Sequence, residues 1–299
     1  MTSRFAALGL AVFALLAPWP SWAGERDKLG VFGEEGPSAP LTPPAGGRVE
    51  RDIAYGPDAA QRFDVYLPRR PVTSAPVLFM VHGGAWLIGD KAAAAVVANK
   101  AAHWLPAGTV FVSVNYRLAP KADPLGQADD VAKALAVAQA KAPSWGGDPA
   151  RFVLMGHSAG AHLVALLAAD PTIAARQGAR PWLGTVVLDS AALDLVAIMK
   201  EPHLRFYDRV FKNDPAYWHE ASPLERLTRA PGPMLVVCSS RRSQSCPHAR
   251  EFVAKATGLG GPVTLLTEPL RHAEINRTLG EAGSYTDAVD AFLRSVGVP

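Results

Sequence analysis

The sequence predicts an α/β fold in which a mostly parallel central sheet of about eight strands carries helices on both faces. Apolar runs of strand length alternate with helical patterns from residue 48 to the end of the chain. Such alternation favours a parallel sheet covered on both sides. The chain has 299 residues, 49% of them hydrophobic, which is enough to bury the core of one large domain.

Two strand-like segments precede the alternation, and six more strands fall within it. The expected strands are residues 48–54, 62–67, 77–81, 109–114, 151–155, 185–188, 234–238 and 263–267. The expected helices are residues 92–104, 128–142, 159–169, 248–257 and 285–296. Sites in such folds lie at the carboxyl ends of strands, so functional residues are expected directly after them.

The first 47 residues are expected to lie outside the folded domain. Residues 1–23 have the features of a secretory signal: Arg4, an apolar run over 5–16, and small residues before a cleavage site after Ala23. An uncleaved anchor is the alternative, but the run is shorter than the roughly 20 residues that span a bilayer. We therefore expect export to the periplasm or the medium, with no membrane span after cleavage. Residues 24–47, rich in Pro and Gly, are expected to form a flexible leader to a domain at 48–299.

Residues 195–229 interrupt the alternation of strands and helices. The segment starts with a helix-like pattern and contains Phe206, Tyr207, Phe211, Tyr217 and Trp218. An insertion after the sixth strand would lie above the site, so a lid or pocket wall is expected here. The alternative is an ordinary packed excursion.

Gly156-His157-Ser158-Ala159-Gly160 separates an apolar strand from an apolar helix. Small residues two before and two after a serine permit a sharp, strained turn that exposes its hydroxyl. The N-terminus of the following helix directs free N–H groups at negative charge that develops nearby. The pattern predicts that Ser158 is the nucleophile of a hydrolase.

A glycine-containing loop, His82-Gly83-Gly84-Ala85-Trp86, directly follows the strand at 77–81. The backbone amides of Gly83 and Gly84, together with that of Ala159, are predicted to form an oxyanion hole. A tight turn without an electrostatic role is the alternative. His82 is expected to hold this loop, since it is fixed at the strand end and poorly placed to move protons.

A serine hydroxyl needs a general base, which in this order of elements comes later in the chain. His272 follows the last expected strand and precedes the final helix, so we predict that it is the base. His157 and His162 flank the serine turn and are expected to pack against it or line it. Surface or core roles are expected for His103, His203, His219 and His248.

Together with Asn115-Tyr116-Arg117-Leu118-Ala119-Pro120 and Gly147-Asp148-Pro149, these motifs resemble the α/β-hydrolase carboxylesterases. The likeness is greatest to the group that includes feruloyl-type esterases and kynurenine formamidases, and it covers residues 49–298. It implies the α/β-hydrolase fold and hydrolysis of a small ester, or less often an amide, through an acyl-enzyme without a cofactor. It also implies structural roles for Asn115, Tyr116 and Arg117.

The carboxylate partner of the histidine is where the sequence departs from these relatives. Their acid usually follows the seventh strand, yet residues 238–246 contain no Asp or Glu. Without a carboxylate the imidazole would lose its orienting partner. Asp189, at the end of the sixth strand, is the predicted acid, an arrangement that resembles pancreatic lipase. Asp194, which resembles a family residue usually taken as structural, and Glu268 and Glu274 are the alternatives.

The only two cysteines, Cys238 and Cys246, lie eight residues apart in one expected loop. Export permits a disulfide, so we expect them to pair. Two independent buried thiols are the alternative. A disulfide would restrain the acid-free loop beside the histidine.

Charge and metal-ligand patterns exclude other classes of function. The 30 basic and 27 acidic residues are scattered, without the clustering typical of nucleic-acid binding. No His/Cys cluster has zinc spacing, and Asp129-Asp130 is expected to cap the start of a helix. Gly146-Gly147 precedes a strand, which argues against a dinucleotide site. We expect neither a metal nor a cofactor.

The predicted function is that of a serine carboxylesterase that cleaves small-molecule carboxylic esters. An arylformamidase or another small-amide hydrolase is the enzymatic alternative. A catalytically silent relative that binds a ligand is the alternative from another class, favoured by the missing acid after the seventh strand. The acyl and alcohol groups and the oligomeric state are left open.

Overall fold

The computed structural model describes residues 47–299, so the expected signal segment and nearly all of the expected leader lie outside the described residues. One sheet holds eight strands in the order β1-β2-β4-β3-β5-β6-β7-β8. Strand β2 is antiparallel to β1 and β4, and all other neighbours are parallel. The predicted fold class is therefore confirmed. The strands are β1 Arg48–Ala54, β2 Arg62–Leu67, β3 Ala75–Val81, β4 Val110–Val114, β5 Gly147–His157, β6 Gly184–Leu188, β7 Met234–Ser239 and β8 Val263–Glu268.

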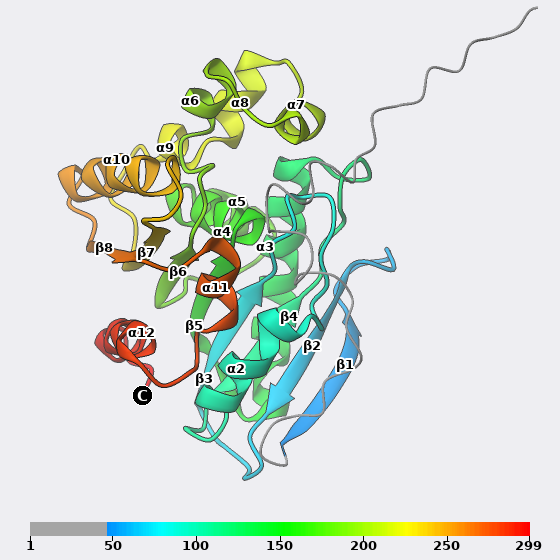
Figure 1. Cartoon of the computed structure of the whole chain (residues 1–299). Helices are drawn as coiled ribbons and strands as arrows, with labels where there is room; N and C mark the ends of the chain where they lie inside the picture. The colour runs from blue at the N-terminus through cyan, green and yellow to red at the C-terminus, as the bar shows by residue number, and fades with distance from the viewer. Residues whose placement is uncertain (1–46) are drawn as a thin grey trace, which may run out of the picture.

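The two faces of the sheet line two separate hydrophobic cores, because successive side chains of a strand point to opposite sides. Along β3, Val77, Phe79 and Val81 enter one core, whereas Leu78 and Met80 enter the other. Helices α3 (Pro124–Lys141), α4 (Ala159–Ala169) and α10 (Ser245–Gly258) cover the first face. Helices α2 (Ala94–Trp104), α11 (His272–Arg277) and α12 (Ser284–Ser295) cover the second. Both layers of helices are visible around the sheet in Figure 1.

Helix α3 begins earlier than expected, and the capping role expected for Asp129-Asp130 was wrong. The helix starts at Pro124, and its N-cap is Asp123, whose carboxylate accepts from the amide of Gly126 at 3.1 Å. Proline suits the first turn because it lacks the N–H that a helix start leaves unpaired. Asp130 instead lies in the middle of the helix sequence, and its side chain is buried. Its carboxylate accepts from Nε and Nη2 of Arg117 at 2.8 and 2.7 Å.

The insertion between β6 and β7 forms four short helices: α6 Leu195–Lys200, α7 Arg205–Phe211, α8 Pro215–Ala221 and α9 Pro223–Arg226. Figure 1 shows α6, α7 and α8 gathered at one end of the molecule, beyond the sheet. Trp86, from the loop after β3, packs against α7, with its ring centroid 4.8 Å from that of Phe211. The insertion therefore covers the carboxyl end of a central strand.

The remaining helices are short: α5 Thr172–Arg176 and the 3-10 turn η2 Ala142–Trp145. Within residues 47–299, no helix has both the length and the hydropathy needed to cross a bilayer.

Candidate active site

Ser158 stands on a strained turn between β5 and α4. Its φ of 55° and ψ of −114° are costly for a residue with a side chain. A Cβ at Gly156 would lie 2.3 Å from the carbonyl oxygen of Gly160, and one at Gly160 would lie 2.2 Å from that of Val81. Both glycines are thus required by close packing. The short distance at Gly160 also shows that the start of α4 lies close against the end of β3, so the glycine loop lies near the serine turn.

Three side chains from separate parts of the chain form a continuous series of contacts. Nε2 of His272 lies 2.9 Å from Oγ of Ser158, and Nδ1 of His272 lies 2.5 Å from Oδ2 of Asp189. Asp189 directly follows β6, and His272 is the first residue of α11, shortly after β8. The three residues meet because the carboxyl ends of β5, β6 and β8 lie at the same edge of the sheet.

Burial and nearby charges determine the protonation states of His272 and Asp189. Burial, with smaller contributions from the charges of Arg242 and His157, lowers the pKa of His272 to about 4, against the opposing effect of Asp189. Burial alone would raise the pKa of the Asp189 carboxyl, but the hydrogen bond and charge of His272, the charge of Arg242 and the Ser245 hydroxyl hold it well below its usual range. A neutral imidazole that donates Nδ1–H to the carboxylate leaves Nε2 free to accept a proton from the serine.

The three alternative acids are engaged elsewhere or out of reach. Asp194 caps α6 and accepts from the amide of Ala197 at 3.0 Å. Glu274 accepts from the amide of Arg271 at 2.7 Å in a capping box of α11. In the part of the chain that the structure describes, Asp189 is the only carboxylate within hydrogen-bond distance of the His272 ring, so Glu268 also makes no such contact.

Cys238 and Cys246 form a disulfide with an S–S distance of 2.04 Å, so the expected pairing is confirmed. The expectation that both cysteines lie in one loop was wrong. Cys238 lies in β7, at the end of the expected strand 234–238, and Cys246 lies in the first turn of α10, because that helix begins at Ser245 and not at residue 248. The bond therefore ties a strand end to a helix start.

The residues between these cysteines supply contacts that the sequence analysis missed. Oδ1 of Asp189 accepts from the amide of Ser239 at 2.8 Å and from the hydroxyl of Ser245. Oδ2 accepts from Nη1 of Arg242 at 2.9 Å. The available signal was the Arg241-Arg242 pair in a segment without acids, since a buried carboxylate at the end of the neighbouring strand requires donors.

The glycine loop is held by the residues around it. His82 donates Nδ1–H to the carbonyl oxygen of Gly83 at 2.7 Å and stacks on Tyr116 with ring centroids 4.5 Å apart. The Tyr116 hydroxyl donates to the carbonyl oxygen of His82 at 3.0 Å. Gly84 has a φ of 105°, and a Cβ there would lie 2.0 Å from the carbonyl oxygen of Ile88. Only glycine fits this turn. Ala159, the third residue predicted to contribute an oxyanion-hole amide, is the first residue of α4 and directly follows the serine.

A pocket of about 310 Å³ opens beside Ser158 and His272, a size that suits a small ligand. One wall is aromatic and consists of Trp86, Phe206 and Tyr207. The rings of Phe206 and Tyr207 stack with centroids 4.3 Å apart. The polar part of the lining includes Ser190, His203, Arg242 and Gln244. Residues of the insertion thus contribute much of the pocket wall.

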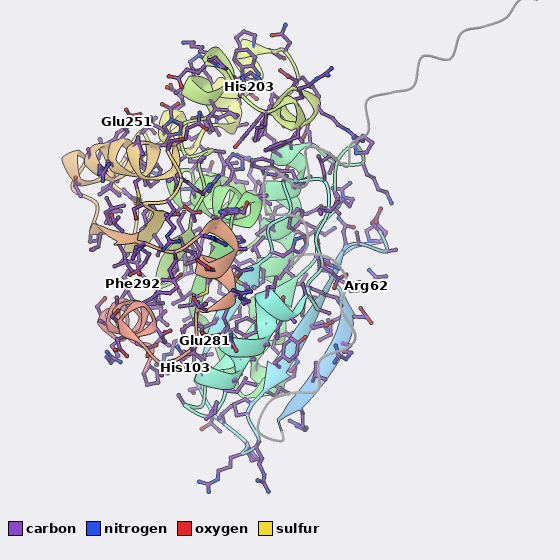
Figure 2. The ribbon with its side chains drawn as sticks, in the orientation of Figure 1. Arg62, His103, His203, Glu251, Glu281 and Phe292 are labelled. Carbon is purple, nitrogen blue, oxygen red and sulfur yellow. A yellow bond between two sulfur atoms is a disulfide. The ribbon has the colours of Figure 1, made fainter. Side chains whose placement is uncertain are left out.

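The other histidines make contacts away from the serine hydroxyl. His157 donates Nε2–H to the carbonyl oxygen of His272 at 3.1 Å, and the two rings lie 4.5 Å apart. His203 differs from expectation because it lines the pocket; Figure 2 shows it among the helices of the insertion, at the opposite end of the molecule from His103. Three others make core or surface contacts: His103 contacts Asp290, His219 contacts Glu225, and His248 contacts the carbonyl oxygen of Ala191.

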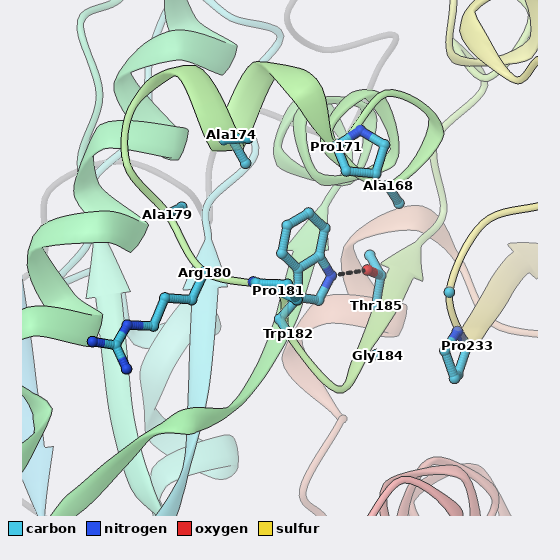
Figure 3. A pocket seen from close by; sticks show the side chains of 12 residues that line it. Ala168, Pro171, Ala174, Ala179, Arg180, Pro181, Trp182, Gly184, Thr185 and Pro233 are labelled. Atoms are coloured by element: carbon cyan, nitrogen blue, oxygen red, sulfur yellow. Dashed lines mark hydrogen bonds between the residues drawn. The ribbon is translucent and has the colours of Figure 1, made fainter. Parts of the chain in front are cut away.

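A second pocket lies at the opposite edge of the sheet, where β6 begins (Figure 3). It is lined by apolar groups such as Pro171 and Pro233, and the Trp182 indole donates to Oγ1 of Thr185 at 2.9 Å. Arg180 is its only ionisable lining residue. This pocket lacks the groups needed for acid–base chemistry. Across residues 47–299, no group of three or more His, Cys, Asp or Glu side chains is placed to bind a metal ion.

Along the chain the serine comes first and the histidine last, on a sheet whose central strands are parallel, and this arrangement is that of the α/β-hydrolases. The chain has the α/β-hydrolase fold. More particularly, it belongs to the BD-FAE family, whose profile matches residues 63–241.

Curated relatives resemble the chain in sequence, and solved structures share its fold. Esterase LipC of Mycobacterium tuberculosis is 34% identical over 245 residues, which cover 74% of this chain and 60% of LipC. The chain thus spans somewhat less than two thirds of that relative. Esterase B of Lactobacillus rhamnosis has a similar fold, with a TM-score of 0.71 at 18% identity over 92% of this chain and 91% of that one. A truncated carbohydrate esterase from gut microbiota has a TM-score of 0.72 at 17% identity, over 85% of this chain and 99% of that one.

Proposed function

We propose that the protein is a serine carboxylesterase that cleaves small carboxylic esters through an acyl-enzyme. The observation that carries this proposal is the series of contacts from Oγ of Ser158 through His272 to Asp189, at 2.9 and 2.5 Å. It has the geometry by which a neutral imidazole activates a hydroxyl while a carboxylate fixes the tautomer. The name of LipC as an esterase supports the same conclusion.

In the proposed reaction, Oγ of Ser158 attacks the ester carbonyl carbon while Nε2 of His272 takes the hydroxyl proton. The carbonyl oxygen becomes an oxyanion that accepts from the amides of Gly83, Gly84 and Ala159. Collapse of this intermediate breaks the bond to the alcohol oxygen, which receives the proton from His272. The acyl group remains on Ser158.

Water then repeats the sequence on the acyl-enzyme. His272 takes one proton from water as the hydroxide attacks the acyl carbon, and it returns that proton to Oγ as the free acid leaves. Asp189 stays ionised and stabilises the imidazolium in both halves. The number of protons on the enzyme is the same at the start and at the end.

The pocket favours a small substrate with an apolar or aromatic group. Trp86, Phe206 and Tyr207 form a wall against which such a group would pack, beside the serine hydroxyl. Because the wall comes largely from residues 202–207, we propose that the insertion at 195–229 acts as a pocket wall that determines substrate size.

Hydrolysis of a short p-nitrophenyl ester and labelling by a fluorophosphonate probe test the proposal. Wild-type protein should show both, and Ser158→Ala should lose both while it keeps the fold. Ser144→Ala, a change at an exposed serine, is the matched control and should behave as wild type. A folded wild-type protein that neither hydrolyses esters nor accepts the probe would instead be a silent binding relative.

A substrate panel separates the esterase from the arylformamidase. Acetyl and feruloyl esters should be cleaved with a higher kcat/KM than a formyl-aryl amide. A preference for the formyl amide by tenfold or more would replace the proposed activity with that of an amidase.

We also propose that the protein is exported, with cleavage after Ala23 and a leader that ends near residue 47. The disulfide between Cys238 and Cys246 supports this, since such bonds persist in oxidising compartments. Mass spectrometry of protein recovered outside the cytoplasm should find an N-terminus at Gly24. Recovery of the full-length chain from the cytoplasm alone would contradict export.

A further inference from the structure

Arg242 contacts both partners of the proposed acid–base pair. Its Nη1 lies 2.9 Å from Oδ2 of Asp189 and 3.2 Å from the carbonyl oxygen of the same residue. The same nitrogen lies 3.0 Å from Nδ1 of His272. A single guanidinium nitrogen therefore lies where the carboxylate oxygen and the imidazole meet, although the sequence analysis gave this residue no role.

The Asp189 carboxylate is fully buried and depends on a few donors. Apart from His272, all its side-chain contacts come from residues 239–245, here called the tied segment because Cys238 and Cys246 close its two ends. Ser239 and Ser245 bind Oδ1, which leaves Oδ2 for Arg242 and His272. A buried ionised carboxylate without such donors would be costly.

We propose that Arg242 is a positioning residue that holds Oδ2 of Asp189 against Nδ1 of His272, and that the tied segment exists to deliver it. This inference rests on the proposed esterase activity. Arg242 acts through Asp189, since its contact to the carbonyl oxygen and to Oδ2 fixes the rotation of that side chain. Without Arg242, Oδ2 would be held by His272 alone, while Ser239 and Ser245 hold Oδ1.

The same contact has an electrostatic consequence. A cation 3.0 Å from the imidazole disfavours the imidazolium, so a neutral residue at 242 should raise the pKa of His272. The main charge effects on this pKa come from Asp189, Arg242 and His157. Other titratable groups around the same ring or its helix are Glu268 of β8, His203 and Tyr207 of the pocket wall, Tyr285 of α12, Lys100 of α2, and Arg271 and Glu274 beside it on the chain.

The test compares Arg242→Gln with Arg241→Gln in the full chain, with kcat, KM and the pH profile of kcat/KM for a p-nitrophenyl ester. Both changes remove one positive charge, but Arg241 is exposed. Arg242→Gln should lower kcat about tenfold or more, leave KM within about threefold, and move the acidic limb upward by about one pH unit. Arg241→Gln should match wild type in all three.

Arg242→Lys separates position from charge. Lysine keeps the positive charge, so its acidic limb should stay near that of wild type. Its kcat should remain reduced, because the flexible stem of lysine does not hold an ammonium group in one place as the planar guanidinium holds Nη1. If Arg242→Gln does not fold, as judged by circular dichroism, the reduced kcat of folded Arg242→Lys at unchanged KM carries the test.

The proposal is overturned if folded Arg242→Gln keeps the kcat and acidic limb of wild type. It is also overturned if only KM rises, because Arg242 would then bind substrate and not position Asp189. These failures differ from failure of the proposed function, in which wild-type protein itself would show no hydrolysis that depends on Ser158.

Discussion

The indole N–H of Trp86 donates to Nδ1 of His162 across 3.2 Å, and this bond joins the loop after β3 to helix α4. Because Nδ1 accepts, Nε2 carries the proton, which it donates to the carbonyl oxygen of Ala221 at 2.7 Å. Burial lowers the pKa of His162 to about 4, so the ring is neutral, as this pattern requires. One imidazole thus connects the glycine loop, the helix after the serine, and the insertion.

Replacement of Trp86 by Phe should affect both activity and stability. Loss of the indole bond should lower the free energy of unfolding by about 1 kcal/mol, and displacement of the loop should lower kcat/KM about tenfold. Trp182→Phe is the matched control, since it also removes an indole bond but lies in the second pocket. It should lose similar stability and keep its activity. Equal activity in the two variants would contradict the role of Trp86.

Asp189→Asn should reduce kcat by about four orders of magnitude, the loss typical when a triad carboxylate is replaced by an amide and the imidazole takes the wrong tautomer. Asp194→Asn serves as the comparison because asparagine caps helices as well as aspartate does. Its activity and melting temperature should remain close to those of wild type. Steady-state kinetics at neutral pH measure kcat for both variants. A large loss of kcat in Asp194→Asn, with little loss in Asp189→Asn, would show that Asp194 is the acid.

The pH dependence of kcat/KM should reflect the lowered pKa of His272. The neutral imidazole is the base that we propose, and a pKa lowered to about 4 keeps it neutral in mildly acidic solution. Activity should therefore be complete at pH 6.5 and above and be lost as the pH falls through the range below 6. A stopped assay by chromatography from pH 3.5 to 8 measures this limb. A midpoint at 6.5 or higher would show that burial does not control the base.

Reduction of the disulfide should destabilise the protein and slow the reaction. Closure of so short a loop is worth roughly 2 to 3 kcal/mol of unfolding free energy. Opening it should also free the tied segment, so kcat should fall while KM changes little. The sequence has only these two cysteines, so a reductant acts at this bond alone. The double variant Cys238→Ser/Cys246→Ser should match the reduced protein, and full activity of either form would contradict a positioning role for the tied segment.

Much of the fold could be predicted because its signals are local. The apolar runs of β3, β6 and β7 are continuous since both faces of these strands are buried, and the sequence marks them clearly. A helix-like start was predicted at residue 195, where α6 begins, but α5 and α7 to α9 were not predicted individually, because helices of fewer than two turns show too little of the apolar period. The start of α3 depended on the Asp123-Pro124 cap, and the apolar pattern begins only later.

The candidate site was predictable to the extent that single segments carry it. The turn around Ser158 is a local pattern, and the structure brings His272 to its hydroxyl. The choice of Asp189 over Glu268 depends on which strand ends meet, and 83 residues separate Asp189 from His272. The roles of all these residues remain predictions until the variants are assayed. Arg242 was missed because its partner is visible only once β6 and β7 are neighbours.

The left-handed backbone at Ser158 has a consequence for how activity could be lost. Glycine adopts such angles without cost, whereas other residues pay about 1 to 3 kcal/mol. A glycine there would thus remove the hydroxyl that we propose as the nucleophile and relax the turn at the same time. At this backbone position, loss of the proposed activity would therefore carry no penalty in folding stability.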